Sequence, residues 1–226
     1  MKNNLKKYFT NFDLLDQALT HRSWVNEHKG IRPTNERLEF LGDAVLEFVV
    51  SNYLYLKYYD KEEGFLTALR SNLVNTTNLS EISKRLSVGE MIFLSKGEEE
   101  GGGRENSSLL ADTLEAIIGA IFLDSGIKKA EKFISQYLLS RLDEIIKKPL
   151  KDAKSRLQEI IQAKSYMAPK YIVIKENGPD HAKEFVIEVV VNQRSIAKGM
   201  GKSKAESEQK AAENALEILA DKDFYL

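Results

Sequence analysis

The chain has 226 residues, of which 42% are hydrophobic and 30% are charged, a composition typical of a globular protein with one large domain or two small ones. Its 33 basic and 34 acidic residues almost cancel, so the overall charge indicates neither a nucleic-acid nor a membrane partner. The absence of cysteine excludes a disulfide framework, a thiolate zinc site and a cysteine nucleophile, and is typical of a reducing compartment. We therefore expect a cytoplasmic protein.

The beginning of the chain and its longest apolar run show no targeting or membrane segment. Basic residues occur among the first seven positions, but no apolar stretch follows them. The longest apolar run, residues 116–123, is too short to cross a bilayer and is interrupted by Gly119. We expect no secretion signal, no membrane span and no membrane partner.

Helical periodicity dominates the first two thirds of the chain. Apolar residues recur three or four positions apart at Leu38, Leu41, Val45 and Phe48, and again between residues 110 and 121. This pattern predicts an all-α domain over residues 1–147. A proline among lysines then breaks the pattern, and we predict a linker over residues 148–151.

The last third of the chain has a different periodicity. A short helix is expected over about residues 152–163, followed by β-rich runs at 171–174, 185–191 and 195–198. The gaps between these runs are hairpin-sized and carry turn residues. From Ser203, a suitable N-cap, the apolar positions again share one helical face. The sequence therefore predicts an α+β protein, in which an all-α domain precedes a small α-β-β-β-α domain over residues 152–222.

Two helices of the predicted all-α domain carry paired carboxylates among apolar residues. Glu39 and Asp43 are four positions apart, and Asp112 and Glu115 are three apart, so each pair shares one helix face. Two carboxylates about 4 Å apart repel each other by roughly 4 kcal/mol at an effective dielectric constant of about 20. Divalent cations relieve such repulsion most directly, and oxygen ligands select hard ions such as Mg²⁺ or Mn²⁺.

Structural roles are the alternative interpretation of the same residues. The first pair can form ion pairs with Arg37 or Arg70, and the second pair has the spacing of a capping box. Glu36 can complement the dipole at the start of its helix. Because charged helix positions are usually solvated, spacing alone favours these structural roles over metal binding.

A longer run of residues favours metal binding over these structural roles. The run Glu36-Arg37-Leu38-Glu39-Phe40-Leu41-Gly42-Asp43 resembles the signature helix of the ribonuclease III family, and the segments 63–66 and 108–120 are similar to its two other characteristic blocks. The resemblance covers essentially the whole chain. It implies that Glu36 and Glu63 are accessory acidic residues that bear on the dimer interface and on substrate processing. It also implies four catalytic metal-binding carboxylates, namely Glu39, Asp43, Asp112 and Glu115.

The last third resembles the double-stranded RNA-binding domain in its α-β-β-β-α order and in the segments 152–159, 178–181 and 199–204. A-form RNA hides its base edges in a deep groove, so its readers contact ribose hydroxyls and phosphates. The chain departs from the family after Lys204, where Ala205 and Glu206 replace commonly basic residues, and we expect a lower affinity for phosphate. By this resemblance we expect RNA contacts from Gln158, Glu159, His181, Lys202, Ser203 and Lys204.

The resemblance implies an endoribonuclease that acts as a homodimer on double-stranded RNA. Its expected cofactor is Mg²⁺, with Mn²⁺ as a substitute. Each strand of the duplex is expected to be cut once, leaving 5′-phosphate ends and short 3′ overhangs, and the implied roles are the processing of rRNA, mRNA and small RNAs. Phe40 and Leu41 are expected in the dimer surface. We expect the acidic, glycine-rich segment 98–103 to be a mobile loop.

Other functions explain the sequence less well. The run Gly201-Lys202-Ser203 imitates the end of a P-loop, but Ile196 stands where its first glycine belongs, so no nucleotide cofactor is expected. No histidine follows a glutamate at the spacing that a di-iron helix bundle needs. Serine–histidine–aspartate catalysis is left open, although no Gly-x-Ser-x-Gly elbow occurs. The serious alternative is a non-catalytic RNA-binding protein, which we would expect to lack at least one of the four carboxylates.

Overall fold

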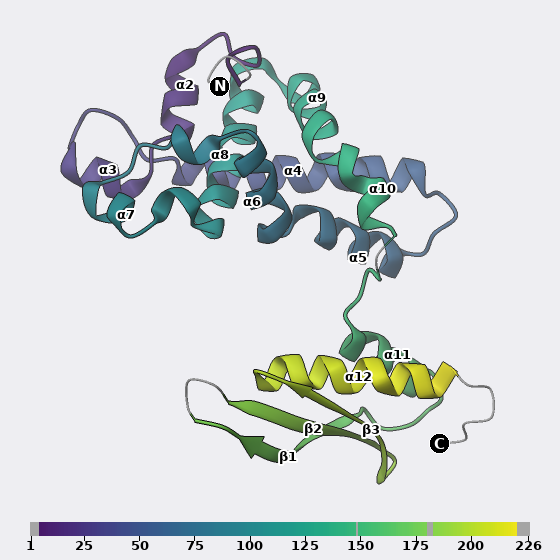
Figure 1. Cartoon of the computed structure of the whole chain (residues 1–226). Coiled ribbons are helices and arrows are strands. Elements are labelled where there is room, and N and C mark those ends of the chain that lie inside the picture. The colour runs from purple at the N-terminus through teal and green to yellow at the C-terminus, as the bar shows by residue number, and fades with distance from the viewer. Residues whose placement is uncertain (1–4, 148, 180–182, 221–226) are drawn as a thin grey trace. The chain divides into compact units, whose positions relative to one another are not determined.

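The structure is a computed structural model of the chain and describes residues 5–147, 149–179 and 183–220 (Figure 1). The chain divides into two compact units, Met1–Leu150 and Lys151–Leu226, each with its own hydrophobic core. The first core lies among helices, and the second lies between a sheet and two helices. The predicted α+β class is therefore confirmed, whereas the domain boundaries at 147 and 152 and the linker at 148–151 stay predictions.

Helices build the first unit. Its longest buried helix, α8, begins after Asn106, whose side-chain oxygen accepts the N–H groups of Ser108 and Leu109 at 2.9 and 3.2 Å. It ends at Gly126, where φ is 78° and a side chain would be strained. The helices and 3₁₀ turns of this unit are α2 (Phe12–Ala18), α3 (Arg22–Glu27), α4 (Glu36–Lys57), α5 (Glu63–Val74), α6 (Thr76–Arg85), η1 (Val88–Glu90), α7 (Lys96–Glu100), η2 (Gly103–Glu105), α8 (Ser107–Ser125), α9 (Ile127–Tyr137), η3 (Leu139–Arg141) and α10 (Leu142–Ile145).

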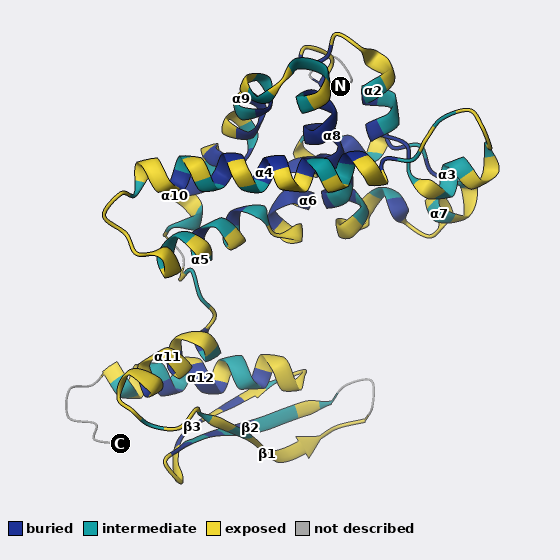
Figure 2. Ribbon diagram, turned by 180° about the vertical axis from the view of Figure 1, so that it is seen from behind, coloured by how far each residue is buried: buried dark blue, intermediate teal, exposed yellow. Residues whose placement is uncertain are grey.

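Helices α4 and α8 pack against each other where each carries a glycine. A Cβ atom at Gly42 would lie 1.7 Å from the carbonyl oxygen of Glu115, and one at Gly119 would lie 2.2 Å from that of Leu38. Neither position has room for a side chain, so the two backbones are in direct contact. Figure 2 shows α8 dark blue over most of its length, because other helices enclose it, while α4 alternates between buried and exposed bands.

The second unit is a three-stranded antiparallel sheet with two helices, α11 (Ala153–Ala163), β1 (Lys170–Asn177), β2 (Glu184–Val191), β3 (Arg194–Gly201) and α12 (Lys204–Ala220), and the strand order is β1-β2-β3. Alternate residues of β2, Val189 and Val191, are buried in the core between sheet and helices. A Cβ atom at Gly199 of β3 would lie 2.1 Å from the backbone nitrogen of Ala211, so α12 packs directly on that strand. The predicted α-β-β-β-α order is confirmed.

The glycine-rich segment 98–103, which we expected to be a loop, is largely folded. Ser95 caps α7 by accepting the N–H of Glu98 at 3.2 Å. Arg104 donates to the carbonyl oxygens of Gly89 and Ile92 at 2.7 and 3.1 Å and thereby ties the segment to η1. The expectation of a loop was wrong because these contacts, which come from outside the segment, override its loop-like composition.

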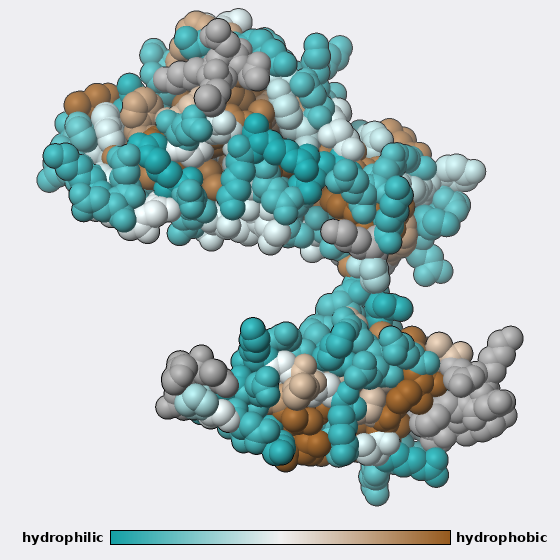
Figure 3. Space-filling model, viewed as in Figure 1, coloured by the Kyte–Doolittle hydropathy of each residue, from teal (hydrophilic) through white to brown (hydrophobic). Residues whose placement is uncertain are grey.

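The surface of both units is predominantly hydrophilic in the view of Figure 3, and hydrophobic atoms reach it only in small groups. Among the helices that the structure describes, none combines the length and the apolar character needed to cross a membrane.

Candidate active site and RNA-binding surface

Three carboxylates from two helices meet beside the crossing of α4 and α8. Glu39 of α4 and the pair Asp112 and Glu115 of α8 each offer one oxygen, and these three oxygens lie within 4.8 Å of one another. All three residues are half-buried. Gly42 follows Glu39, and Gly119 follows Glu115, by about one helical turn, so the backbone contact at the glycines sets the spacing of the carboxylates.

Burial and mutual repulsion favour the protonated forms of these carboxyl groups. The pKa of Glu115 is raised to about 8, first by burial and then by the charges of Asp43, Asp112 and Glu39. Burial, followed by the charge of Asp112, also raises the pKa of Glu39. Burial raises the pKa of Asp112, although the nearby His21 opposes the effect. The cluster therefore carries an excess of negative charge that a proton or a cation can neutralise.

The metal-free protein is expected to lose stability as the pH rises between about 4.5 and about 8, because of Glu115. The unfolded chain releases this proton near pH 4.5, whereas the folded protein keeps it up to about pH 8. In that interval the folded state binds more protons, so the free energy of unfolding falls with rising pH. Denaturant unfolding in EDTA at several pH values measures this slope. Glu115→Gln should flatten it, and an equal slope in both proteins would contradict the assignment.

Asp43 supplies the fourth predicted carboxylate from a more exposed position on α4. It lies outside the group of three oxygens, but its charge has the largest effect of any neighbouring charge on the pKa of Glu115. Within the described part of the chain, no lysine or arginine forms an ion pair with any of the four carboxylates. Four oxygen donors without an ion-paired lysine or arginine fit a hard divalent cation.

The geometry contradicts two of the structural alternatives for these residues, the ion pair with Arg70 and the capping box. Arg70 donates to the hydroxyl of Ser51 at 2.9 Å and forms no ion pair with Glu39 or Asp43. Asp112 and Glu115 lie inside α8, whose N-terminus is capped by Asn106, so they do not form a capping box. Neither an ion pair with Arg70 nor helix capping therefore explains why acidic side chains are half-buried here.

The two accessory acidic residues lie apart from the group of three oxygens. Glu36 stands in the first turn of α4, is exposed, accepts the hydroxyl of Thr34 at 3.0 Å and pairs with Arg22 at 3.4 Å. This position suits the expected interaction with the helix dipole. Glu63 begins α5, is exposed and accepts the hydroxyl of Thr67 at 2.7 Å. Their expected roles in a dimer and in processing stay predictions.

Two further residues, which the sequence did not indicate, act on the acidic cluster. Glu47, one turn beyond Asp43 on α4, adds to the rise in the pKa of Glu115. Its spacing of four residues from Asp43 could have indicated from the sequence that the two share one helix face. His21 interacts electrostatically with Glu98, Glu36 and Asp112, and burial lowers its pKa despite these carboxylates. No local pattern could reveal His21, because its position depends on a long-range backbone hydrogen bond from its N–H to the carbonyl oxygen of Phe93.

The predicted RNA contacts lie at two places on the second unit, and most are exposed. Gln158 and Glu159 project from α11, where Glu159 pairs with Lys151. Lys202, Ser203 and Lys204 lie at the N-terminus of α12. His181 lies outside the described residues.

Glu206 faces the same helix terminus. Its carboxylate accepts the backbone N–H of Lys202 at 2.8 Å, while its own N–H donates to the Ser203 hydroxyl at 3.2 Å. Lys204 pairs with Glu176 at 3.4 Å. The N–H groups and lysines that we expect to meet phosphate are thus partly neutralised, which agrees with the expectation of lower affinity.

Both units match known families in sequence. Residues 11–142 match the profile described as Ribonuclease-III-like, and residues 153–219 match that of the double-stranded RNA binding motif. Ribonuclease 3 of Geobacillus sp. strain WCH70 is 47% identical over 214 residues, which are 94% of this chain and 87% of that protein. Ribonuclease 3 of Streptococcus uberis is 42% identical over 222 residues, which are 98% of this chain and 96% of that protein.

A solved structure adds a match in three dimensions. The nuclease domain of ribonuclease III from Campylobacter jejuni, described for structural flexibility in a region involved in dimer formation, is 43% identical. The match has a TM-score of 0.55 and covers 60% of this chain and 94% of that one.

A helical nuclease domain with an acidic cluster, followed by a double-stranded RNA-binding domain, defines an endonuclease for double-stranded RNA. The chain belongs to the ribonuclease III family. Its activity is therefore that of a ribonuclease on double-stranded RNA, which confirms the predicted enzyme class and decides against the non-catalytic alternative. The family is metal-dependent in general, and the acidic cluster could bind a metal.

Proposed function

We propose that this enzyme hydrolyses double-stranded RNA with Mg²⁺ held by the four carboxylates Glu39, Asp43, Asp112 and Glu115. The observation that carries the proposal is the meeting of three half-buried carboxylate oxygens within 4.8 Å, with no ion pair to a lysine or arginine among the described residues. When bound, the ion supplies Lewis-acid chemistry, which activates water at neutral pH and stabilises the departing 3′-oxygen. Mn²⁺, which also prefers oxygen ligands, is expected to substitute.

The protein's own part in this reaction is to hold the carboxylates in place before the substrate arrives. The close backbone packing at Gly42 and Gly119 sets how near α4 and α8 approach, and so it sets the distance of Glu39 from Asp112 and Glu115. Glu115, whose pKa is about 8, gives up its proton when a cation binds. Metal affinity is therefore expected to rise between pH 6 and about pH 8.

We further propose that the enzyme is a homodimer that pairs through α4. Phe40, Phe48 and Tyr55 of this helix are 81%, 60% and 70% exposed, which is unusual for large side chains on one helix. An open cavity of about 630 Å³ at Phe40 has an apolar side formed by Leu38, Leu41 and Leu123 and a polar side formed by Gln17, Glu36 and Arg37. In a twofold pair each chain offers the same surface, so Phe40 of one chain can fill this cavity in the other. The dimer formation described for the Campylobacter jejuni nuclease domain supports a dimer of this chain.

The expected products follow from two clusters in one dimer. Each cluster cuts one strand, which yields 5′-phosphate ends and short 3′ overhangs. The processing of rRNA, mRNA and small RNAs and a cytoplasmic location are part of the same proposal, and they rest on membership of the family.

A cleavage assay on a long perfect RNA duplex tests the proposal. We expect cutting with Mg²⁺ or Mn²⁺ and none in EDTA, 5′-phosphate ends on the products, and the mass of two chains in sedimentation. Cutting that continues in EDTA would exclude the metal mechanism. A monomer that cuts both strands would exclude the dimer.

For the second unit we propose that Gln158, Glu159 and the N-terminus of α12 contact the RNA, with His181 added from the segment outside the described residues. The support is the match to the RNA-binding motif and the exposure of the described members of this set. Because the contacts are to ribose and phosphate, binding should depend little on base sequence.

Charge changes at the start of α12 are expected to move RNA affinity in both directions. Ala205 is exposed beside Lys204, so Ala205→Lys should strengthen duplex binding severalfold and steepen its salt dependence. Lys202→Ala should weaken binding and reduce the slope of log K against log salt by about 1, and Lys202→Arg should not. Filter binding at four salt concentrations measures both effects. Unchanged slopes would place the phosphate contacts elsewhere.

A further inference from the structure

The chain stays attached to the nuclease domain beyond its last helix. Helix α10 ends at Ile145, and Ile146 caps it by donating its N–H to Leu142 at 2.9 Å. Four residues later, Leu150 packs its half-buried side chain against the core of the first unit. Its carbonyl oxygen accepts the side-chain amide of Asn72 at 2.6 Å. This hydrogen bond joins positions 78 residues apart and fixes the last residue of the first unit.

Asn72 is itself held rigidly. Its side-chain amide also donates to the carbonyl oxygen of Ala68 at 2.8 Å on its own helix, α5, and its carbonyl oxygen accepts the amide of Asn75 at 3.1 Å. Asn75 in turn caps α6 by accepting the N–H of Asn78 at 2.8 Å. Asn72 therefore has a defined place at the corner between α5 and α6.

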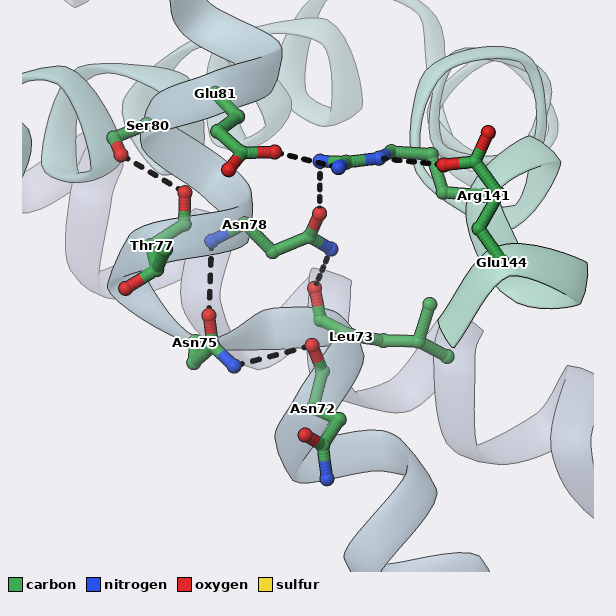
Figure 4. A network of polar contacts seen from close by, with 9 residues as sticks. All are labelled: Asn72, Leu73, Asn75, Thr77, Asn78, Ser80, Glu81, Arg141 and Glu144. Atoms are coloured by element: carbon green, nitrogen blue, oxygen red, sulfur yellow. Dashed lines mark hydrogen bonds and ion pairs between the residues drawn. The ribbon is translucent and has the colours of Figure 1, made fainter. Parts of the chain in front are cut away.

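A polar network ties this corner to the end of the first unit (Figure 4). The amide of Asn78 donates to the carbonyl oxygen of Leu73 at 2.5 Å, and its oxygen accepts the guanidinium of Arg141 from η3. The same guanidinium donates to Glu81 at 2.5 Å. With only 14% of its side chain exposed, Arg141 cross-links α6 to the segment that leads into α10. The hydrogen bond from Asn72 thus holds Leu150 to a rigid part of the domain.

The RNA-binding domain begins almost at once. Asp152 caps α11 by accepting the N–H of Ser155 at 3.1 Å, and it also accepts the side-chain amide of Gln209 from α12 at 2.8 Å. Asp152 is therefore bound within the second unit. Between Leu150 and Asp152 stands one residue, Lys151, whose ammonium pairs with Glu159.

The tether is the stretch of chain between the last residue held by the first unit and the first residue held by the second. Its length depends on whether Leu150 is bound to the first unit. With it, the tether runs over two residue steps, about 7 Å at full extension. Without it, the tether would run from Ile146 to Asp152, six steps or about 20 Å at full extension. Once a tether is longer than the span between two linked modules, further length lowers their effective concentration, so we expect the longer tether to lower it severalfold.

We propose that Asn72 is a positioning residue that sets the tether length and thereby the efficiency with which RNA held by the second domain reaches the catalytic carboxylates. It touches neither the acidic cluster nor the RNA-binding residues in the described part of the chain. Replacing Asn72 is therefore expected to raise KM and to leave kcat unchanged.

The test compares Asn72→Asp with Asn75→Asp in the full-length enzyme. A carboxylate at 72 keeps the shape of the side chain but cannot donate to Leu150. Asn75→Asp makes the same charge change three residues away, and it is the matched control because it keeps the acceptor that caps α6 and leaves the bond from Asn72 to Leu150 intact. It loses only the donation from residue 75 to the carbonyl oxygen of Asn72. For Asn72→Asp we expect a KM raised severalfold for a long duplex, kcat within about twofold of the wild type, and faster trypsin cleavage after Lys147 and Lys151. Asn75→Asp should stay near the wild type in all three.

An insertion tests tether length without touching Asn72. Four residues of Gly-Ser placed between Lys151 and Asp152 should raise KM as Asn72→Asp does. An unchanged KM in the insertion variant, or a wild-type KM and trypsin pattern in Asn72→Asp, overturns the proposal. A fall in kcat at constant KM in Asn72→Asp also overturns it, because the residue would then act on the catalytic site.

Discussion

Replacing Glu115 by Gln is expected to reduce duplex cleavage by about 10³-fold or more, because the lost metal-dependent stabilisation of the transition state is worth several kcal/mol. Glu115 is the carboxylate whose pKa is raised to about 8 and one of the three whose oxygens meet within 4.8 Å. Glutamine keeps the size of the side chain but removes the charge that a cation needs. Duplex binding should persist, since the RNA-binding domain is a separate unit.

Single-turnover cleavage and duplex binding on the same samples measure this prediction. Glu105→Gln makes the same change at an exposed residue of η2, outside the cluster. It should leave the cleavage rate and the duplex affinity unchanged. The metal dependence supplies a second readout, because Glu115→Gln should weaken Mn²⁺ binding in a direct titration. A variant that cleaves at more than a tenth of the wild-type rate would remove Glu115 from the metal site.

Replacing Gly42 by Ala is expected to lower the free energy of unfolding by about 3 kcal/mol or more, because overpacking here meets backbone rather than side chain. The new Cβ atom would lie 1.7 Å from the carbonyl oxygen of Glu115 and 2.5 Å from its carbonyl carbon. Helices α4 and α8 must then separate, which moves Glu39 away from Glu115. Cleavage should therefore fall with stability, even at temperatures where the variant is folded.

Denaturant unfolding and cleavage at low temperature test this prediction. Gly97→Ala is the matched control, because Gly97 is also helical and a Cβ atom there meets nothing within 4 Å. It should be neutral or stabilising by up to about 1 kcal/mol, as alanine favours the helix. A Gly42→Ala enzyme with the stability and activity of the control would show that the helices are not locked together at this point.

Much of the fold was predictable because helices and strands follow local periodicity. The apolar spacing of α4 and α8 and the change of period after residue 150 lie within short windows of sequence. Strand β1 was predicted over 171–174 but extends over Lys170–Asn177. Its additional residues are mostly charged or polar, and a register shift between Val173 and Lys175 disturbs the alternation, so no local pattern marks them.

The sequence indicated which residues form the candidate site, but spacing alone did not indicate their role or their electrostatic environment. The signature run and the block around residues 108–120 identified the four carboxylates through resemblance, whereas spacing alone left structural roles open. The interpretation of Asp112 and Glu115 as a capping box was wrong, because α8 begins five residues before Asp112. The influence of His21 on the cluster depends on a contact with Phe93 that no local window contains.

The sequence by itself determined the two-domain α+β organisation, because periodicity is a local property. It also determined the RNA-binding motif and the catalytic candidates, because their local runs of residues resemble known families. Only the tertiary structure decided that Glu39 meets Asp112 and Glu115, that the pKa of Glu115 rises to about 8, and that Asn72 holds Leu150. These properties depend on burial and on contacts between residues more than 70 positions apart. Packing sets them, and here the close approach of two backbones at Gly42 and Gly119 brings the carboxylates together.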